Sequence, residues 1–160
     1  MIKVIEQDLL KFECDAIMHQ CNCFCTMGSG VARSIRSLYP EVYDHDCKTR
    51  RGDEKKLGKV GAVKIKKPDA IIKYCFNNYS QFNYGYGKRQ TNYEAFYRCL
   101  EKVRDFSQEN GMKSLAAPCK MGCTLAGGDW DICFPMFTSV FGEGDINLTI
   151  CKYPQPIKQN

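Results

Sequence analysis

The sequence predicts an α/β fold in which helices cover both faces of a central sheet. Short apolar runs, typical of buried strands, alternate along the chain with segments whose apolar residues recur at helical spacing. Glycine-rich or polar loops separate these segments, and no internal repeat interrupts the alternation. The 160 residues, 44% of them hydrophobic and 26% charged, are enough to build one core, so we expect a single domain.

Strands and helices alternate through the first half of the chain. Four short runs are apolar or alternating and are expected to be strands: 2–6, 15–19, 60–65 and 70–76. A turn at 67–69, which contains Pro68, joins the last two. Val31, Ile35 and Leu38 recur at helical spacing and predict a helix that Pro40 ends, and a short second helix follows over 41–50.

The second half continues this alternation. The polar and aromatic segment 77–89 is expected to be a loop. Thr91 and Glu94 have capping-box spacing, so a helix is expected to begin at Thr91 and to end at residues 110–111, an Asn-Gly pair. A glycine-rich loop at 122–128 separates the remaining elements, which are a strand over 114–118, a helix from Asp129 through Val140, and a strand over 146–151.

Hydropathy and cysteine content limit the class of protein. No run reaches the roughly 18 apolar residues that span a bilayer, and acidic side chains near the start are unlike a signal peptide, so we expect a cytoplasmic protein. Eleven cysteines are many, but an odd number in a reducing compartment favours small buried apolar residues over disulfides. Two alternatives concern residues 21–25: a zinc site completed by Cys119 and Cys123, or exposed thiols at Cys23 and Cys25. We expect neither a metal nor a cofactor.

Basic and aromatic residues gather in two regions. The net charge is +5, and many of the basic residues lie within 48–73, which suits a polyanionic ligand but also a solvated helix end and strand face. Nucleic-acid binding would use basic runs too, yet no nucleic-acid module motif is present. Aromatic residues crowd 76–97: those at 93–97 are expected to pack under a helix, and the loop tyrosines to form a rim over a nucleotide or a single nucleic-acid strand. Lys88 or Arg89 is expected to contact a terminal phosphate.

Two glycine-rich loops, 27–32 and 122–128, each precede a predicted helix. Small residues let backbone N–H groups approach an oxyanion, and a helix N-terminus adds a partial positive charge. Two such loops in one sheet could hold a diphosphate from opposite sides. Neither loop has the G-x-G-x-x-G pattern of a dinucleotide-binding fold or the G-K-[ST] of a P-loop.

Four motifs, in this order, resemble those of macro domains. Residues 6–10 resemble the family's turn after its first strand, 15–23 its D-A-I-V-N-A-A-N element, 28–32 its G-G-G-V-A loop, and 118–130 its second glycine-rich loop ending in Trp. The resemblance covers nearly the whole chain. It implies a three-layer α-β-α macro domain with a mixed central sheet over residues 1–153, followed by a flexible C-terminal tail over 154–160.

Within the superfamily, residues 19–23 and 125–130 are similar to terminal ADP-ribose protein glycohydrolase and ADP-ribose 1″-phosphate phosphatase, a branch with many small phage and bacterial members. The resemblance implies that Asp8 accepts a hydrogen bond from adenine and Asn22 contacts the distal ribose, although Asp8 could cap its own turn and Asn22 form an Asx turn. Backbone amides of the two loops would hold the diphosphate, and Cys151 or Tyr153 would neighbour adenine. The expected ligand-binding residues are Asp8, Leu9, Asn22, Met27, Gly28, Ser29, Gly30, Val31, Gly122, Cys123, Thr124, Leu125, Ala126, Gly127 and Tyr153.

Departures from the glycohydrolase pattern bear on catalysis. The family's lysine after the fourth-strand region is absent, and Ala126 stands where the second loop has an aspartate, so a covalent lysine mechanism is not expected. Thr124 adds a Cβ near the ligand path, where the family has glycine. The expected catalytic residues are His19, which can take up a proton near neutral pH, and Asp129, which can orient water. The alternatives are a satisfied buried histidine and a helix N-cap.

The resemblance implies a protein that binds ADP-ribose or a derivative of it. The first interpretation is a hydrolase of ADP-ribose 1″-phosphate or of ADP-ribosyl esters on protein or nucleic acid. The alternative is a non-catalytic reader or scavenger of ADP-ribose or a related signalling nucleotide. A nucleic-acid-binding module is a third interpretation, supported only by net charge and the aromatic loop. We expect a monomer with no membrane partner.

Overall fold

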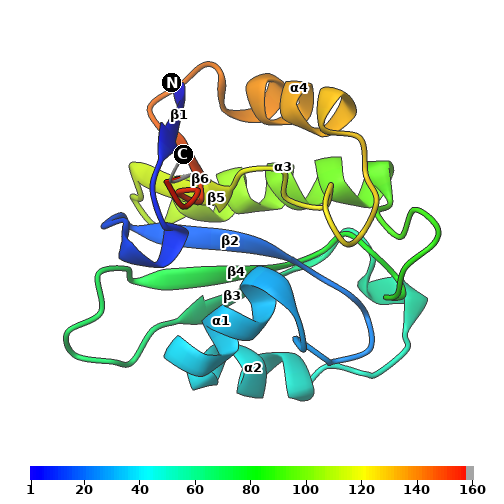
Figure 1. Ribbon diagram of the computed structural model, residues 1–160. Helices are drawn as coiled ribbons and strands as arrows, with labels where there is room; N and C mark the ends of the chain where they lie inside the picture. The colour runs from blue at the N-terminus through cyan, green and yellow to red at the C-terminus, as the bar shows by residue number, and fades with distance from the viewer. Residues whose placement is uncertain (158–160) are drawn as a thin grey trace.

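A six-stranded sheet forms the middle of the molecule. The computed structural model describes residues 1–157 (Figure 1). The strand order is β1-β6-β5-β2-β4-β3, and neighbours run parallel except β3 and β4, so the sheet is mixed. The strands are β1 (Ile2–Glu6), β2 (Ala16–Cys21), β3 (Val60–Lys64), β4 (Tyr74–Tyr79), β5 (Ser114–Pro118) and β6 (Asn147–Lys152).

Helices cover both faces of this sheet, which confirms the predicted three-layer α/β fold (Figure 1). Helices α1 (Gly30–Leu38) and α2 (Pro40–Cys47) lie on one face, and α3 (Tyr93–Glu109) and α4 (Trp130–Phe141) on the other. Two short 3-10 helices, η1 (Leu9–Lys11) and η2 (Glu54–Lys56), lie in the connections. Within the described residues, no helix combines the length and apolarity needed to cross a membrane.

Strand β2 separates two halves of the hydrophobic core. Side chains alternate between the faces of a strand, so Ala16 and Met18 pack with α3 and α4, whereas Ile17 packs with α1 and α2. Each of these three side chains is at most 1% exposed, because helices cover both faces. Strand β2 is therefore packed between the two helical layers.

Strand β4 differs from the prediction. The expected strand 70–76 begins later, at Tyr74, and continues to Tyr79 through residues expected to form a loop. β2 sets this register, since Ala16 pairs with Tyr74 and Cys21 with Tyr79. Asn77 and Asn78 are fully buried despite their polarity, so hydrophobicity alone misplaced the strand.

The N-cap of α3 also differs from the prediction. Asn92, and not Thr91, caps the helix, because its side chain accepts a hydrogen bond from Ala95 N at 2.9 Å. Thr91 instead donates from Oγ1 to the carbonyl of Gly122 at 2.5 Å. Thr91 thus belongs to the wall of a loop cluster rather than to the helix.

The end of α1 and the start of α4 agree with the sequence-based prediction. α1 stops at Leu38, and Pro40 occupies the first turn of α2, where a missing N–H costs nothing. Asp129 caps α4 by accepting from Asp131 N at 2.9 Å, and α4 continues through Pro135.

The described cysteines are all free thiols, and most are buried. The alternative of an exposed thiol at Cys23 is wrong, because that side chain is 0% exposed beneath the loop that follows β2, and Cys25 is half-buried. Among residues 1–157, no group of three or more metal-ligating side chains is arranged to hold an ion. Of the expected tail, residues 154–157 are exposed and have no regular secondary structure, and 158–160 lie outside the described residues.

Candidate functional site

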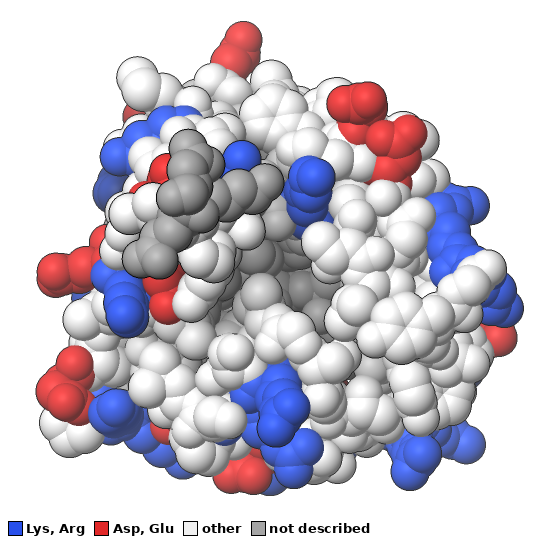
Figure 2. Space-filling view, viewed as in Figure 1, with Lys and Arg blue, Asp and Glu red and all other residues white. Residues whose placement is uncertain are grey.

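A cleft of about 750 Å³ opens at the C-terminal ends of β2 and β5. It lies between the first loop, residues 22–29, and the second loop, residues 119–129. A Cβ built on Gly30 would lie 3.8 Å from Leu125 Cδ1, so the two loops approach each other closely. Figure 2 shows that this face of the molecule is hollowed and that uncharged side chains form most of the hollow's walls. The volume is within the range of pockets that enclose small ligands.

The backbone of the first loop is unusual. Cys25 and Met27 have φ angles of 57° and 39°, which side chains other than glycine rarely adopt. Lys120, in the second loop, is the third non-glycine residue of positive φ in the described chain. Each such residue costs about 1–2 kcal/mol, so this strain is concentrated around the cleft.

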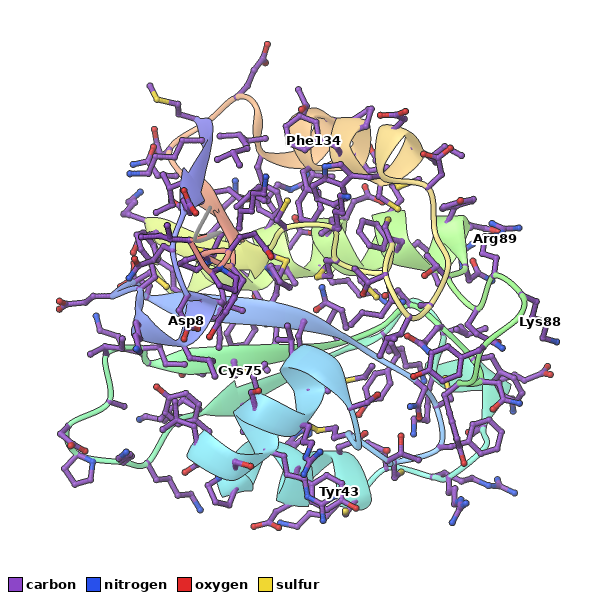
Figure 3. The ribbon with its side chains drawn as sticks, in the orientation of Figure 1. Asp8, Tyr43, Cys75, Lys88, Arg89 and Phe134 are labelled. Carbon is purple, nitrogen blue, oxygen red and sulfur yellow. The ribbon has the colours of Figure 1, made fainter. Side chains whose placement is uncertain are left out.

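Helices α1 and α2 hold the first loop in place. Tyr43 of α2 donates from its hydroxyl to the carbonyl of Cys25 at 3.3 Å, and Arg36 of α1 donates to the carbonyl of Thr26 at 3.4 Å. The Arg36 guanidinium lies 3.6 Å from the centre of the Tyr43 ring, and Figure 3 shows Tyr43 on the outer helical layer. Asn22 forms the predicted alternative, an Asx turn: Oδ1 accepts from Phe24 N at 2.8 Å and Nδ2 donates to Thr26.

The first loop leads into the N-terminus of α1, which faces the cleft. The N-cap residue Ser29 makes no side-chain capping hydrogen bond. The first-turn N–H groups of Gly30, Val31 and Ala32 have no acceptor within the helix, and no other protein acceptor is found for them among the described residues. Backbone donors at a helix N-terminus suit an anion.

The second loop is closed upon itself. Gly128 N donates to the carbonyl of Gly122 at 2.9 Å, and Gly127 N donates to that of Thr124 at 3.2 Å. Gly122 has a φ of 74°, and a Cβ there would lie 2.7 Å from Gln20 Oε1. Only glycine therefore fits at this position without displacing Gln20.

Gln20 links the end of β2 to the surrounding loops. Its Nε2 donates to Gln81 Oε1 and Thr91 Oγ1, both at 2.9 Å, and its Oε1 accepts from Ser80 Oγ at 2.6 Å. Thr91 in turn holds the carbonyl of Gly122. The second loop is thus joined to the segment after β4 through Gln20, which lines the cleft, and Thr91.

His19 lies at the base of the cleft and is 1% exposed. Asn77 Nδ2 donates to the carbonyl of Val42 at 3.2 Å, which leaves Asn77 Oδ1 to accept from His19 Nε2 at 2.6 Å. Burial lowers the pKa of His19 to about 4, so the ring is neutral at pH 7, with Nδ1 as its unprotonated nitrogen. Cys21 Sγ lies 3.5 Å from His19 Nε2, and burial raises the pKa of that thiol.

Most of the expected ligand-binding residues line this cleft, and six expected site residues do not. Those that line it are Asn22, Met27, Gly28, Ser29, Gly30, Val31, Gly122, Thr124, Leu125 and Ala126, together with His19. Those outside the lining, all within the described chain, are Asp8, Leu9, Cys123, Gly127, Asp129 and Tyr153. Asp129 caps α4, and Tyr153 is 67% exposed beyond the end of β6.

Asp8 and the basic pair Lys88 and Arg89 lie at opposite ends of the molecule. Figure 3 shows Asp8 beside the start of β2 and the basic pair on the loop before α3. Asp8 caps η1 by accepting from Leu10 N at 2.9 Å, and the Arg89 guanidinium lies 4.3 Å from the centre of the Tyr93 ring. Within the described chain, none of these three side chains lines the cleft.

Some residues of the cleft were not predicted from the sequence. Gln20 directly follows His19 near the end of β2, and this position could have predicted that Gln20 lines the cleft. Asp46 comes from α2 and is buried, and only helix packing brings it to the cleft. Among the described lining residues, Asp46 is the acidic one and Lys120 the basic one. Two tyrosines of the predicted aromatic rim, Tyr84 and Tyr86, also line the cleft, which supports that part of the prediction.

Comparison with known proteins agrees with the fold. The macro domain family model matches residues 18–137. An uncharacterized 17.5 kDa protein of Enterobacteria phage T4 is 33% identical over 135 residues, which cover 82% of this chain and 84% of the relative.

Solved structures show the same architecture. The macrodomain of Mycobacterium tuberculosis DarG superposes with a TM-score of 0.79 and 22% identity, covering 97% of this chain and 99% of that one. Thermosipho africanus DarTG, solved in complex with ADP-ribose, gives a TM-score of 0.76 and 20% identity over 99% of this chain and 42% of that one. This protein belongs to the macro domain family.

Proposed function

We propose that this macro domain binds ADP-ribose, or a derivative of it, in the cleft between the two loops. The observation that carries the proposal is the convergence of both loops on one cleft, with first-turn N–H groups of α1 available to an anion. A diphosphate fits this position, since backbone donors lie on one side and the glycine-rich second loop on the other. The complex of DarTG with ADP-ribose supports the same choice of ligand.

Hydrolysis at the distal ribose is the finer proposal. His19 lies at the base of the cleft with Nδ1 as a proton acceptor, and it could take a proton from an attacking water. The substrate would be ADP-ribose 1″-phosphate, which water converts to ADP-ribose and phosphate, or an ADP-ribosyl ester. Asp129 caps α4 outside the cleft lining, so we propose that His19, and not Asp129, takes the proton.

The alternative is a reader or scavenger without turnover. A neutral histidine of low pKa is a weak base, and both Asn77 and burial stabilise its uncharged form. Binding would then be the whole function of the cleft.

Calorimetry with ADP-ribose, followed by a turnover assay, tests the proposal. We expect saturable binding at one site and release of phosphate from ADP-ribose 1″-phosphate, or of carboxylate from an ester. Binding without turnover of either substrate class would favour the non-catalytic reader or scavenger, and the absence of binding would refute the proposal.

A substitution tests the assignment of Asp8 to adenine. Asp8→Ala should weaken the binding of ADP-ribose more than that of ribose 5-phosphate if Asp8 contacts adenine. Equal losses would reject that assignment, because losing the η1 cap affects both ligands alike.

A further inference from the structure

One buried oxygen of Asp46 has no hydrogen-bond partner among the described residues. Asp46 is 1% exposed and lines the cleft from α2. Its Oδ1 accepts a hydrogen bond from the Tyr79 hydroxyl at 2.6 Å. Its Oδ2 is buried, and no donor is found for it among the described residues. Leaving a buried carboxylate oxygen unpaired is costly, so this atom marks an incomplete site.

The nearby cation does not complete it. Lys56 Nζ donates to the carbonyl of Cys23 at 3.1 Å and to Thr49 Oγ1 at 2.7 Å, and it lies 4.8 Å from the centre of the Tyr79 ring. No ion pair within residues 1–157 includes Asp46. The lysine is therefore used to fasten the first loop.

Other titratable groups around Asp46 supply no donor to Oδ2 either. The titratable groups that interact with it are Lys56 from η2, Tyr79 from β4, Cys21 from β2, Cys23 from the first loop, and Tyr43 and His45 from its own helix. Burial is the largest influence and raises the pKa of Asp46, whereas Tyr79 and Lys56 lower it. The carboxyl is thus held where a new hydrogen-bond donor would stabilise its charged form.

The position of Asp46 indicates which donor this is. Asp46 shares the base of the cleft with His19 and Cys21, beneath the first loop. A phosphate group would bring negative charge against a carboxylate, whereas a neutral hydroxyl brings a donor. We propose that Asp46 is a specificity-determining residue whose Oδ2 accepts a hydrogen bond from a hydroxyl of the ligand's terminal ribose. This inference rests on the proposed binding of ADP-ribose.

The test compares ADP-ribose with ADP, which lacks the terminal ribose. Calorimetry on the full chain should show that the wild type prefers ADP-ribose, and that Asp46→Asn reduces this preference about 10- to 100-fold while ADP binds as before. The variant keeps an acceptor for Tyr79 and removes the one at Oδ2. Asp44→Asn is the matched control, because Asp44 is exposed on the same helix and carries the same charge. It should leave both affinities unchanged.

A second measurement uses only wild-type protein, in case the variant does not fold. Protonation of Asp46 removes its acceptor, so the ratio of the two affinities should fall as pH is lowered from 7 into the range where Asp46 takes up a proton, which its raised pKa places above the usual range of an aspartate. A ratio independent of pH, or an Asp46→Asn protein with undiminished preference, would overturn the inference and leave ADP-ribose binding intact. A wild type that binds neither ligand would overturn the proposed function as well.

Discussion

At the scale of single residues, the state of His19 is set by its neighbours. A histidine in water titrates near pH 6.5, but here α1, α2 and the sheet exclude solvent from the ring. Asn77 holds one nitrogen, and its own amide is held by the carbonyl of Val42. The result is a ring of fixed tautomer at the base of the cleft, which suits a proton acceptor better than a charge-bearing group.

This state predicts an unusual pH profile. If His19 takes the proton from water, kcat for ADP-ribose 1″-phosphate should stay constant from pH 7 to about 5 and fall only as pH approaches 4, the pKa of His19.

Replacement of His19 tests the same role. His19→Ala should lower kcat at least about 100-fold and leave ADP-ribose affinity within a few-fold. Steady-state rates and calorimetry measure the two effects. A fall in rate centred on pH 6.5 would assign the proton transfer to another group, and loss of binding would make His19 structural.

At the scale of elements, the second loop depends on glycine at one point of contact. Gly122→Ala should disrupt the loop, because its Cβ would strike Gln20 Oε1 and the φ of 74° strains any side chain. We expect a loss of about 1–3 kcal/mol in the free energy of unfolding and at least a 10-fold loss of ADP-ribose affinity.

Gly111→Ala separates the two causes. Gly111 has a similar φ of 68°, but nothing lies within 4 Å of the added Cβ, and it ends α3 away from the cleft. It should lose stability by backbone strain alone and bind ADP-ribose as the wild type does. Equal binding by both variants would show that the Gln20 contact does not shape the cleft.

The start of α3 gives another test at this scale. Asn92→Ala should lower the free energy of unfolding by about 1 kcal/mol, because it removes the acceptor for Ala95 N. Thr91→Ala instead removes the hydrogen bond to Gly122 and the acceptor for Gln20. It should therefore weaken ligand binding more than Asn92→Ala does. Urea denaturation measures the stability of each variant and calorimetry its affinity for the ligand. A larger loss of stability in Thr91→Ala, together with a larger loss of affinity in Asn92→Ala, would indicate that Thr91 is the cap.

These elements show how far the sequence predicts the molecule. Hydrophobic periodicity and glycine position correctly give the order of strands and helices and both loops, since these signals are local. The start of β4, its buried Asn77 and Asn78, and the cap of α3 depend on pairing with β2 and on contact with the second loop, which local signals do not contain. Asp46 was missed for the same reason, because helix packing alone brings it to the cleft.

At the scale of the whole molecule, the cleft lies along one edge of the central sheet. Parallel strands β2, β5 and β6 end on the same side, which is where α/β folds bind ligands. Asp8 lies at one end of this arrangement and the aromatic loop at the other (Figure 3). His19 and Asp46 are buried at the cleft and have shifted pKa values, so their protonation links the cleft to the stability of the whole fold.

Acid should therefore destabilise the protein in a specific range of pH. The folded-state pKa of His19 lies below its unfolded value of 6.5, so the unfolded state binds more protons between about pH 6.5 and 4, and stability is lost as pH falls through that window. The loss should be on the order of 3 kcal/mol. Asp46 acts oppositely, because its raised pKa lets the folded state take up a proton first. Urea denaturation at pH 7, 5.5 and 4.5 should show a steeper acid loss for Asp46→Asn than for the wild type, and a shallower one for His19→Asn. Parallel pH dependence in all three proteins would exclude both groups as the source of the acid sensitivity.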